Sequence, residues 1–196
     1  MATHDNTWEI FLHVRIIMGV VVALSIARLL SGASRFIQHP SGAKLSWIHL
    51  GWVVFMLISL VHFWWWEFWL SVIKQWTFEI YVVLFGYTIV LYLLCTLLFP
   101  DDIKEYGGYD DYFFSRRKWF FGLLALTFVF DLADTLVKGV GHIDRFGIEY
   151  IARTAGYFVL CGIAMLTPNR RFHAVFVIGS LIYLLVWILR HFETLN

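Results

Sequence analysis

Apolar residues occur in six long continuous runs that are separated by short polar segments. A helix needs about 20 apolar residues to cross a bilayer. Transmembrane β-strands would instead alternate apolar and polar residues over roughly 10 positions. The pattern therefore predicts an all-α fold, that of a polytopic membrane protein with six transmembrane helices. The runs cover Trp8 to Ser31, Ser46 to Trp66, Phe78 to Phe99, Lys118 to Val137, Phe146 to Leu166 and Phe172 to His191.

The composition agrees with this pattern. Of the 196 residues, 60% are hydrophobic and only 15% are charged, whereas soluble domains have about 45–50% apolar and about 25% charged residues. A chain this short cannot enclose so much apolar surface in water. The net charge of +1 indicates no nucleic-acid partner. We expect a single transmembrane domain over residues 1–196, with three-helix halves at 1–99 and 118–196 and a cytoplasmic loop at 100–117.

The distribution of Lys and Arg predicts the orientation in the membrane. Eight of these residues flank the loops after the first, third and fifth runs, and four lie on the opposite side. The positive-inside rule then places both termini outside the cytoplasm. Two groups of residues are expected to contact lipid or a partner: the basic residues at the end of the 100–117 loop and the aromatic residues at the outer end of the second run. They are Arg116, Arg117 and Lys118, and Trp64, Trp65 and Trp66.

The two halves show matching positions that suggest an internal repeat. A shift of 105 or 106 residues overlays Ala27 on Ala133 and Gly51 on Gly156, and a shift of 93 overlays Gly86 on Gly179. Because three spans is an odd number, the halves would run in opposite directions, as in many transporters. A possible 3+3 inverted repeat is therefore one interpretation, and chance similarity between apolar helices is the other. The second half lacks the stretch from Trp64 to Trp69.

Ionisable side chains inside the membrane are costly, so each is a candidate functional residue. Asp131, Asp134 and Arg153 fall at one depth in the outer half, and the two aspartates share a helix face. We expect Arg153 to lie between the two carboxylates, either as a structural ion pair or as a proton or cation site. Arg28 and His49 fall near the inner face, where Arg28 would extend to lipid phosphate or attract anions. A transport path would be lined by the first and fourth spans.

Histidines raise the alternative of haem b. His49 and His62 are 13 residues apart, about 20 Å along a helix, whereas His173 and His191 are 18 apart, about 27 Å. The two spacings disagree, so two stacked bis-histidine haems are disfavoured. We expect no cofactor and no metal. The chain has no catalytic motif of the GxSxG, HExxH, CxxC or GxGxxG type, and we expect no enzyme activity.

Three stretches carry a resemblance to known sequences: Ala27 to Arg35, His62 to Trp65 and Tyr112 to Gly122. In them the chain resembles a group of small bacterial integral membrane proteins with six spans, over most of its length. The resemblance implies a bacterial inner-membrane location and transfers no activity or site residue.

Two hypotheses of different classes follow from these observations. The first is a small channel or transporter for ions or protons, assembled as a homo-oligomer in the lipid bilayer. The second is a non-catalytic membrane sensor or anchor subunit, for example of a stress or phage-defence system, that binds a cytoplasmic protein through residues 101–118. A haem-b electron carrier is the third and least favoured hypothesis.

Overall fold

The computed structural model describes residues 2–38, 44–138 and 140–191. In these residues the chain forms six α-helices, each with a stretch long and apolar enough to cross a membrane, and the all-α fold is confirmed. A 3-10 helix, η1, follows the second α-helix. The elements are α1 (Ala2–Gln38), α2 (Trp47–Trp66), η1 (Glu67–Val72), α3 (Phe78–Leu98), α4 (Tyr109–Val137), α5 (Val140–Leu166) and α6 (Arg170–His191).

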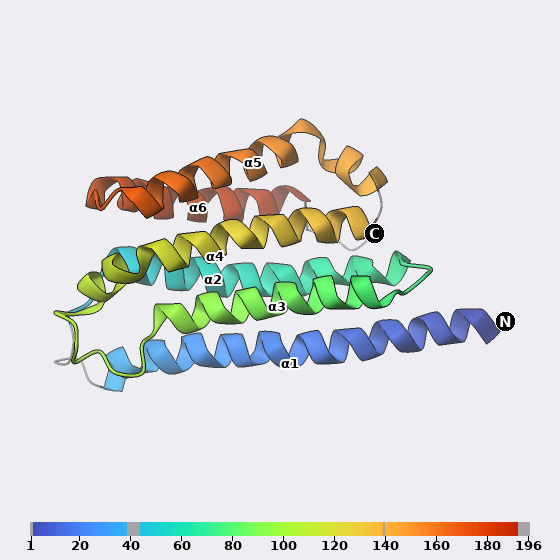
Figure 1. Ribbon diagram of the computed structural model, residues 1–196, viewed down its shortest axis with the longest axis horizontal. Helices are drawn as coiled ribbons and strands as arrows, with labels where there is room; N and C mark the ends of the chain where they lie inside the picture. Colours follow the sequence, from blue (N-terminus) through green and yellow to red (C-terminus); the bar gives the residue numbers. More distant parts are fainter. Residues whose placement is uncertain (1, 39–43, 139, 192–196) are drawn as a thin grey trace.

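The six α-helices lie side by side and alternate in direction (Figure 1). At one end of the bundle, here called the terminus end, lie the start of α1, η1, the start of α5 and the end of α6. The opposite end, here called the loop end, carries the connections from α1 to α2, from α3 to α4 and from α5 to α6. Helix α3 packs between α1 and α4, and α4 packs along α5. Helix α2 is central, because it contacts α1, α3, α4 and α6.

Local sequence signals explain most helix ends. The Ser46 side chain accepts a hydrogen bond from the His49 backbone N–H and caps α2. Thr77 caps α3 in the same way, and α3 ends at Leu98, shortly before Pro100. Helix α5 changes direction at Gly147, whose φ of 61° lies in the left-handed region that favours glycine.

Helix α4 begins earlier than the apolar run predicts. It starts at Tyr109 instead of Lys118, so the connection from α3 is much shorter than the expected 100–117 loop. Gly108, with a φ of 134°, precedes the helix, and Asp110 and Asp111 in its first turn favour the positive end of the helix dipole. The first turns of α4 also bury Tyr112 against the bundle. A search for apolar runs misses such a segment because charged residues interrupt it.

The inverted repeat is not confirmed. If the halves were equivalent, α1 with α3 would correspond to α4 with α6. Helix α1 packs closely along α3, whereas in the described part of the chain the backbones of α4 and α6 stay apart and the two helices meet only through side chains, such as the rings of Phe121 and Phe176. The two halves of the molecule therefore pack differently.

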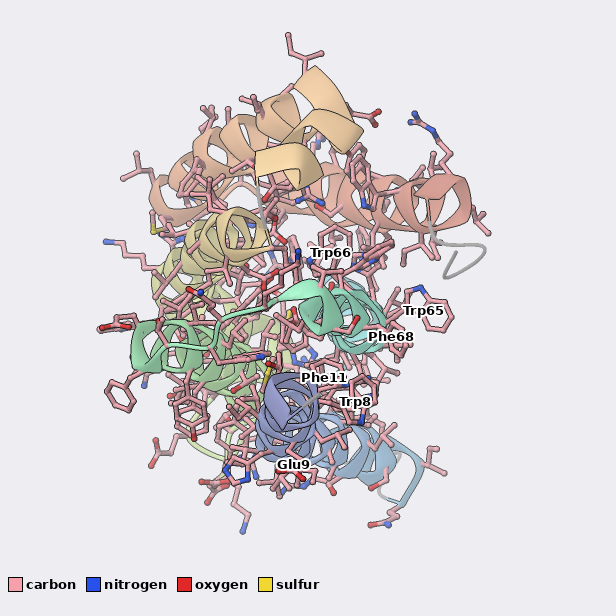
Figure 2. The ribbon with its side chains drawn as sticks, turned by 90° about the vertical axis from the view of Figure 1, so that its right-hand side faces the viewer. Trp8, Glu9, Phe11, Trp65, Trp66 and Phe68 are labelled. Carbon is pink, nitrogen blue, oxygen red and sulfur yellow. The ribbon has the colours of Figure 1, made fainter. Side chains whose placement is uncertain are left out.

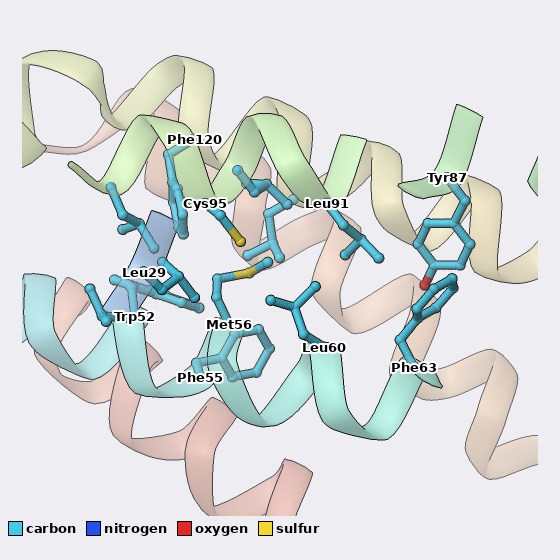
Figure 3. Close-up of a cluster of buried hydrophobic side chains, with 14 of the residues drawn as sticks. Leu29, Trp52, Phe55, Met56, Leu60, Phe63, Tyr87, Leu91, Cys95 and Phe120 are labelled. Carbon is cyan, nitrogen blue, oxygen red and sulfur yellow. The ribbon is translucent and has the colours of Figure 1, made fainter. Parts of the chain in front are cut away.

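The centre of the bundle is filled with apolar and aromatic side chains (Figure 3). Trp52 of α2 is fully buried, and four aromatic rings surround it with centroid distances of 5.2–5.4 Å. These rings belong to Phe55, Phe120, Phe121 and Phe176. This aromatic cluster fills the loop-end half of the bundle. Large apolar side chains such as Ile16, Leu166 and Val175 are instead exposed on the outside of the bundle, as expected of a surface that faces lipid.

Candidate functional site

A small cavity lies inside the bundle, in the half nearer the terminus end. Its volume is about 90 Å³, and side chains of α2, α3, α4, α5 and α6 line it. A buried water needs roughly 10–15 Å³ of such volume, so the cavity has room for several waters. Its lining includes an acidic side chain, Asp131, a basic one, Arg153, and His62, whose imidazole can be neutral or positively charged. Polar cavities of this kind hold water, whereas apolar ones stay empty.

The charged pair at the cavity joins α4 to α5. Arg153 donates a hydrogen bond of 2.6 Å to Asp131 Oδ2, and both side chains are largely shielded from solvent. The Tyr150 hydroxyl donates a second hydrogen bond, of 3.0 Å, to the same oxygen. The Arg153 guanidinium also lies over the rings of Tyr150 and Trp187, at 4.8 and 5.0 Å from their centroids. Ion pairing and ring contacts therefore compensate the buried guanidinium charge.

A second charged cluster lies beside the cavity, where η1 meets the end of α4. Lys138 Nζ lies 2.5 Å from Asp134 Oδ2 and 3.2 Å from Glu67 Oε1, and all three side chains have no exposed surface. The Trp66 indole N–H donates a 3.0 Å hydrogen bond to Asp134 Oδ2. Trp66 also lines the cavity, so a single side chain separates this cluster from it.

The structure thus brings together only part of the expected outer cluster. Arg153 lies beside Asp131, as expected, but Asp134 pairs with Lys138 instead of Arg153. Although Asp131 and Asp134 are three residues apart, their carboxylates point to different neighbours. Sequence reasoning missed Glu67 and Lys138. A signal for Glu67 was present, because it lies in the stretch that has no counterpart in the second half of the chain.

Arg28 and His49 both bind the end of α3. His49 Nε2 lies 2.6 Å from the Leu98 carbonyl oxygen, and the imidazole is fully buried. Arg28 donates hydrogen bonds to the Phe99 carbonyl, at 2.9 Å, and to Asp101 Oδ1, at 2.5 Å. The last carbonyls of a helix have no partner within it. Arg28 and His49 satisfy carbonyls at the end of α3 and do not line the cavity.

Asp101 lies in the connection that follows α3 and is exposed. The hydrogen bond from the Arg28 guanidinium, and then its charge, lower the pKa of the Asp101 carboxyl. Solvent screens this pair, so it holds the connection in place without adding much stability.

The three basic residues expected at a loop lie on helix α4. Arg116 donates a hydrogen bond of 2.8 Å to the Tyr106 hydroxyl, and Arg117 bonds to the Phe114 carbonyl within its own helix. Lys118 follows them on the same helix. Only residues 99–108 connect α3 to α4, so the segment expected to dock a cytoplasmic protein is largely helical.

The three tryptophans at the end of α2 have different environments. Trp65 points outward, whereas Trp66 points into the bundle (Figure 2). Trp64 packs against Gly19 of α1 and under the Arg15 guanidinium, 4.7 Å from the ring centroid. Of the three, Trp65 is the one positioned for lipid contact.

The histidines considered for haem also lie in separate places. The imidazoles of His49 and His173 each bond a backbone carbonyl, at 2.6 and 2.9 Å, so their Nε2 atoms point into packed protein. His62 lines the cavity. The side chain of His191 lies outside the described part of the structure.

A second hollow, about 380 Å³ in volume, lies between α5 and α6 and is lined mainly by apolar residues. Gly156 and Gly179 face it, and a Cβ atom at either position would contact nothing within 4 Å. Arg153, Tyr157 and Tyr183 line both this hollow and the cavity. These three side chains therefore form the wall between the two spaces.

No protein-family model, curated protein or solved structure matches this chain. Its chemistry must therefore be inferred from the site itself.

Proposed function

We propose that this protein is a small membrane transporter or channel for protons or small ions. The observation that supports the proposal is the cavity inside the bundle, because an ionisable His, Asp and Arg line it. Polar and ionisable groups inside a membrane are expensive, and they typically mark ion pathways when they face a water-sized space. The cavity lies within one chain, so the proposed site does not depend on an oligomer.

The packing favours a state that is closed at the loop end. Trp52, Phe113 and Phe121 are buried in the aromatic cluster between the cavity and that end. Conduction would therefore require these rings to move. In the closed state, the cavity would exchange water and ions with the terminus end. The proposed path runs among α2, α3, α4, α5 and α6, which line the cavity, and not along α1 and α4, because α3 separates α1 from α4.

The proposal can be tested with purified protein in liposomes that contain a pH-sensitive dye. A potassium gradient with valinomycin would drive proton flux, and the same vesicles with other cations would test ion flux. We expect flux above that of protein-free vesicles. Asp131→Asn should reduce it to the protein-free level, since an amide accepts hydrogen bonds but carries no charge.

The matched control is Asp101→Asn, which makes the same chemical change in the exposed connection and should leave flux unchanged. Absence of flux from the wild-type protein for every cation tested would contradict the proposed function. Unchanged flux in Asp131→Asn would remove the cavity carboxylate from the mechanism.

A further inference from the structure

The cluster of Glu67, Asp134 and Lys138 is a buried site with an uneven charge balance. Two carboxylates face one ammonium group, and none of the three side chains has exposed surface. If both acids were ionised, one negative charge would be buried without a partner. Such a charge is far more costly to bury than a neutral carboxylic acid.

Among the side chains that the structure describes, the surroundings supply no second positive charge to the cluster. Asp131, on α4, is already paired with Arg153 of α5. Helix α3 contributes the neutral Tyr87, and α2 contributes His62. From α1, Arg15 lies over the rings of Phe11, Trp64 and Phe68.

Two oxygen atoms in the cluster have no hydrogen-bond donor among the described residues. They are Glu67 Oε2 and Asp134 Oδ1, and both are fully buried. A buried carboxylate normally has its oxygens hydrogen-bonded. Their lack of donors indicates that one of the two carboxylates carries a proton. The charge balance leads to the same conclusion independently.

We propose that the cluster is a proton-binding site and that Glu67 carries the proton. Asp134 is the better-stabilised carboxylate, because its Oδ2 accepts from both Lys138, at 2.5 Å, and the Trp66 indole, at 3.0 Å. Among the described residues, the Glu67 carboxylate has only the longer, 3.2 Å contact with Lys138. A metal cation would not fit, since none of the three side chains reaches the cavity and the ammonium group would repel it.

The site deepens the proposed function by naming the proton as the ion. Trp66 lies between the cluster and the cavity, so protons need to pass only one side chain. Uptake would convert one hydronium ion of the cavity into water and one Glu67 carboxylate into the acid. Release would reverse this step. Only this link to transport rests on the proposed function.

Infrared spectroscopy of the purified wild-type protein at neutral pH tests the site directly. A protonated carboxylic acid gives a C=O band separate from the carboxylate bands, and this band shifts when H₂O is replaced by D₂O. We expect the band in the wild type and in Asp101→Asn, and its loss in Glu67→Gln. Absence of the band from the wild type would overturn the proposal, and this result requires no variant to fold.

Two variants test the assignment to Glu67. Glu67→Gln mimics the protonated acid, so its thermal stability should equal or exceed that of the wild type. Asp134→Asn removes the charge of the closest partner of Lys138 and should lower the thermal stability. A band that survives in Glu67→Gln and disappears in Asp134→Asn would overturn the assignment. The spectrum reports the cluster and the flux assay reports the cavity, so each proposal can fail alone.

Discussion

At the scale of single residues, many charged and polar side chains of this protein form a hydrogen bond or ion pair with a specific partner. His49 is the clearest case. Its Nε2 lies 2.6 Å from the carbonyl of Leu98, and a carbonyl can only accept, so Nε2 carries the hydrogen. The same imidazole packs against the rings of Phe99 and Tyr109. His49 therefore links the start of α2 to the end of α3.

Replacing His49 by alanine should destabilise the protein. The substitution leaves the buried Leu98 carbonyl without a donor, which costs about 1–3 kcal/mol, and it removes the ring contacts as well. Thermal unfolding in detergent would measure the effect. His13→Ala, at an exposed position of α1, is the matched control and should be nearly neutral. Equal effects of the two substitutions would contradict the role given to His49.

Asp101 allows a prediction about pH. Its pKa is lowered from the ordinary 3.8 by the hydrogen bond and charge of Arg28. Folding therefore favours the ionised form, and the contribution to stability is present above pH 3.8 and lost as the pH falls through the lower, folded-state pKa. The unfolding temperature of the wild type should exceed that of Asp101→Asn slightly at neutral pH. The difference should shrink in strong acid, and a difference that stays constant with pH would contradict the role given to Arg28.

At the scale of helices, glycines decide which pairs approach closely. A Cβ atom on Gly32 of α1 would lie 2.2 Å from the ring of Phe99, which is almost fully buried. A Cβ atom on Gly179 of α6 would instead meet no other atom within 4 Å. The same substitution should therefore have opposite effects at the two positions.

Gly32→Ala should destabilise the protein by about 1–3 kcal/mol, because the ring and its helix must shift to relieve the overlap. Gly179→Ala should be neutral or stabilising by up to about 1 kcal/mol, because alanine favours the helix. Thermal unfolding of both variants under one condition would measure this contrast. A stabilising Gly32→Ala would show that α1 and α3 are not in close contact at this point.

The helices were more predictable than the site. Continuous apolar runs predict the number of spans because the bilayer requires long apolar segments. They fail at Tyr109, because charged residues such as Asp110, Asp111 and Arg116 interrupt the apolar run in the first turns of α4. Glu67 and Lys138 were not predictable as a pair, because they are 71 residues apart and meet only through the packing of η1 against α4. Arg153 and Asp131 were predictable, because helix direction and depth constrain them.

At the scale of the whole molecule, the fold separates two kinds of interior. The loop-end half is packed with aromatic rings, whereas the terminus-end half holds the cavity and the charged clusters. Which side of the membrane the cavity serves depends on orientation. The excess of Lys and Arg at the loop end predicts that this end faces the cytoplasm. The cavity and Glu67 would then exchange protons with the external side.

Cysteine labelling in intact bacterial cells would test this orientation. Lys74 and Lys104 are exposed at opposite ends of the bundle, and the native Cys95 and Cys161 are buried, so the parent protein should label weakly. A membrane-impermeant maleimide should label Lys74→Cys in intact cells and Lys104→Cys only after lysis. The opposite result would place the cavity on the cytoplasmic side. Labelling of both positions in intact cells would contradict the membrane crossing itself, because α3 alone separates them along the chain and must span the bilayer.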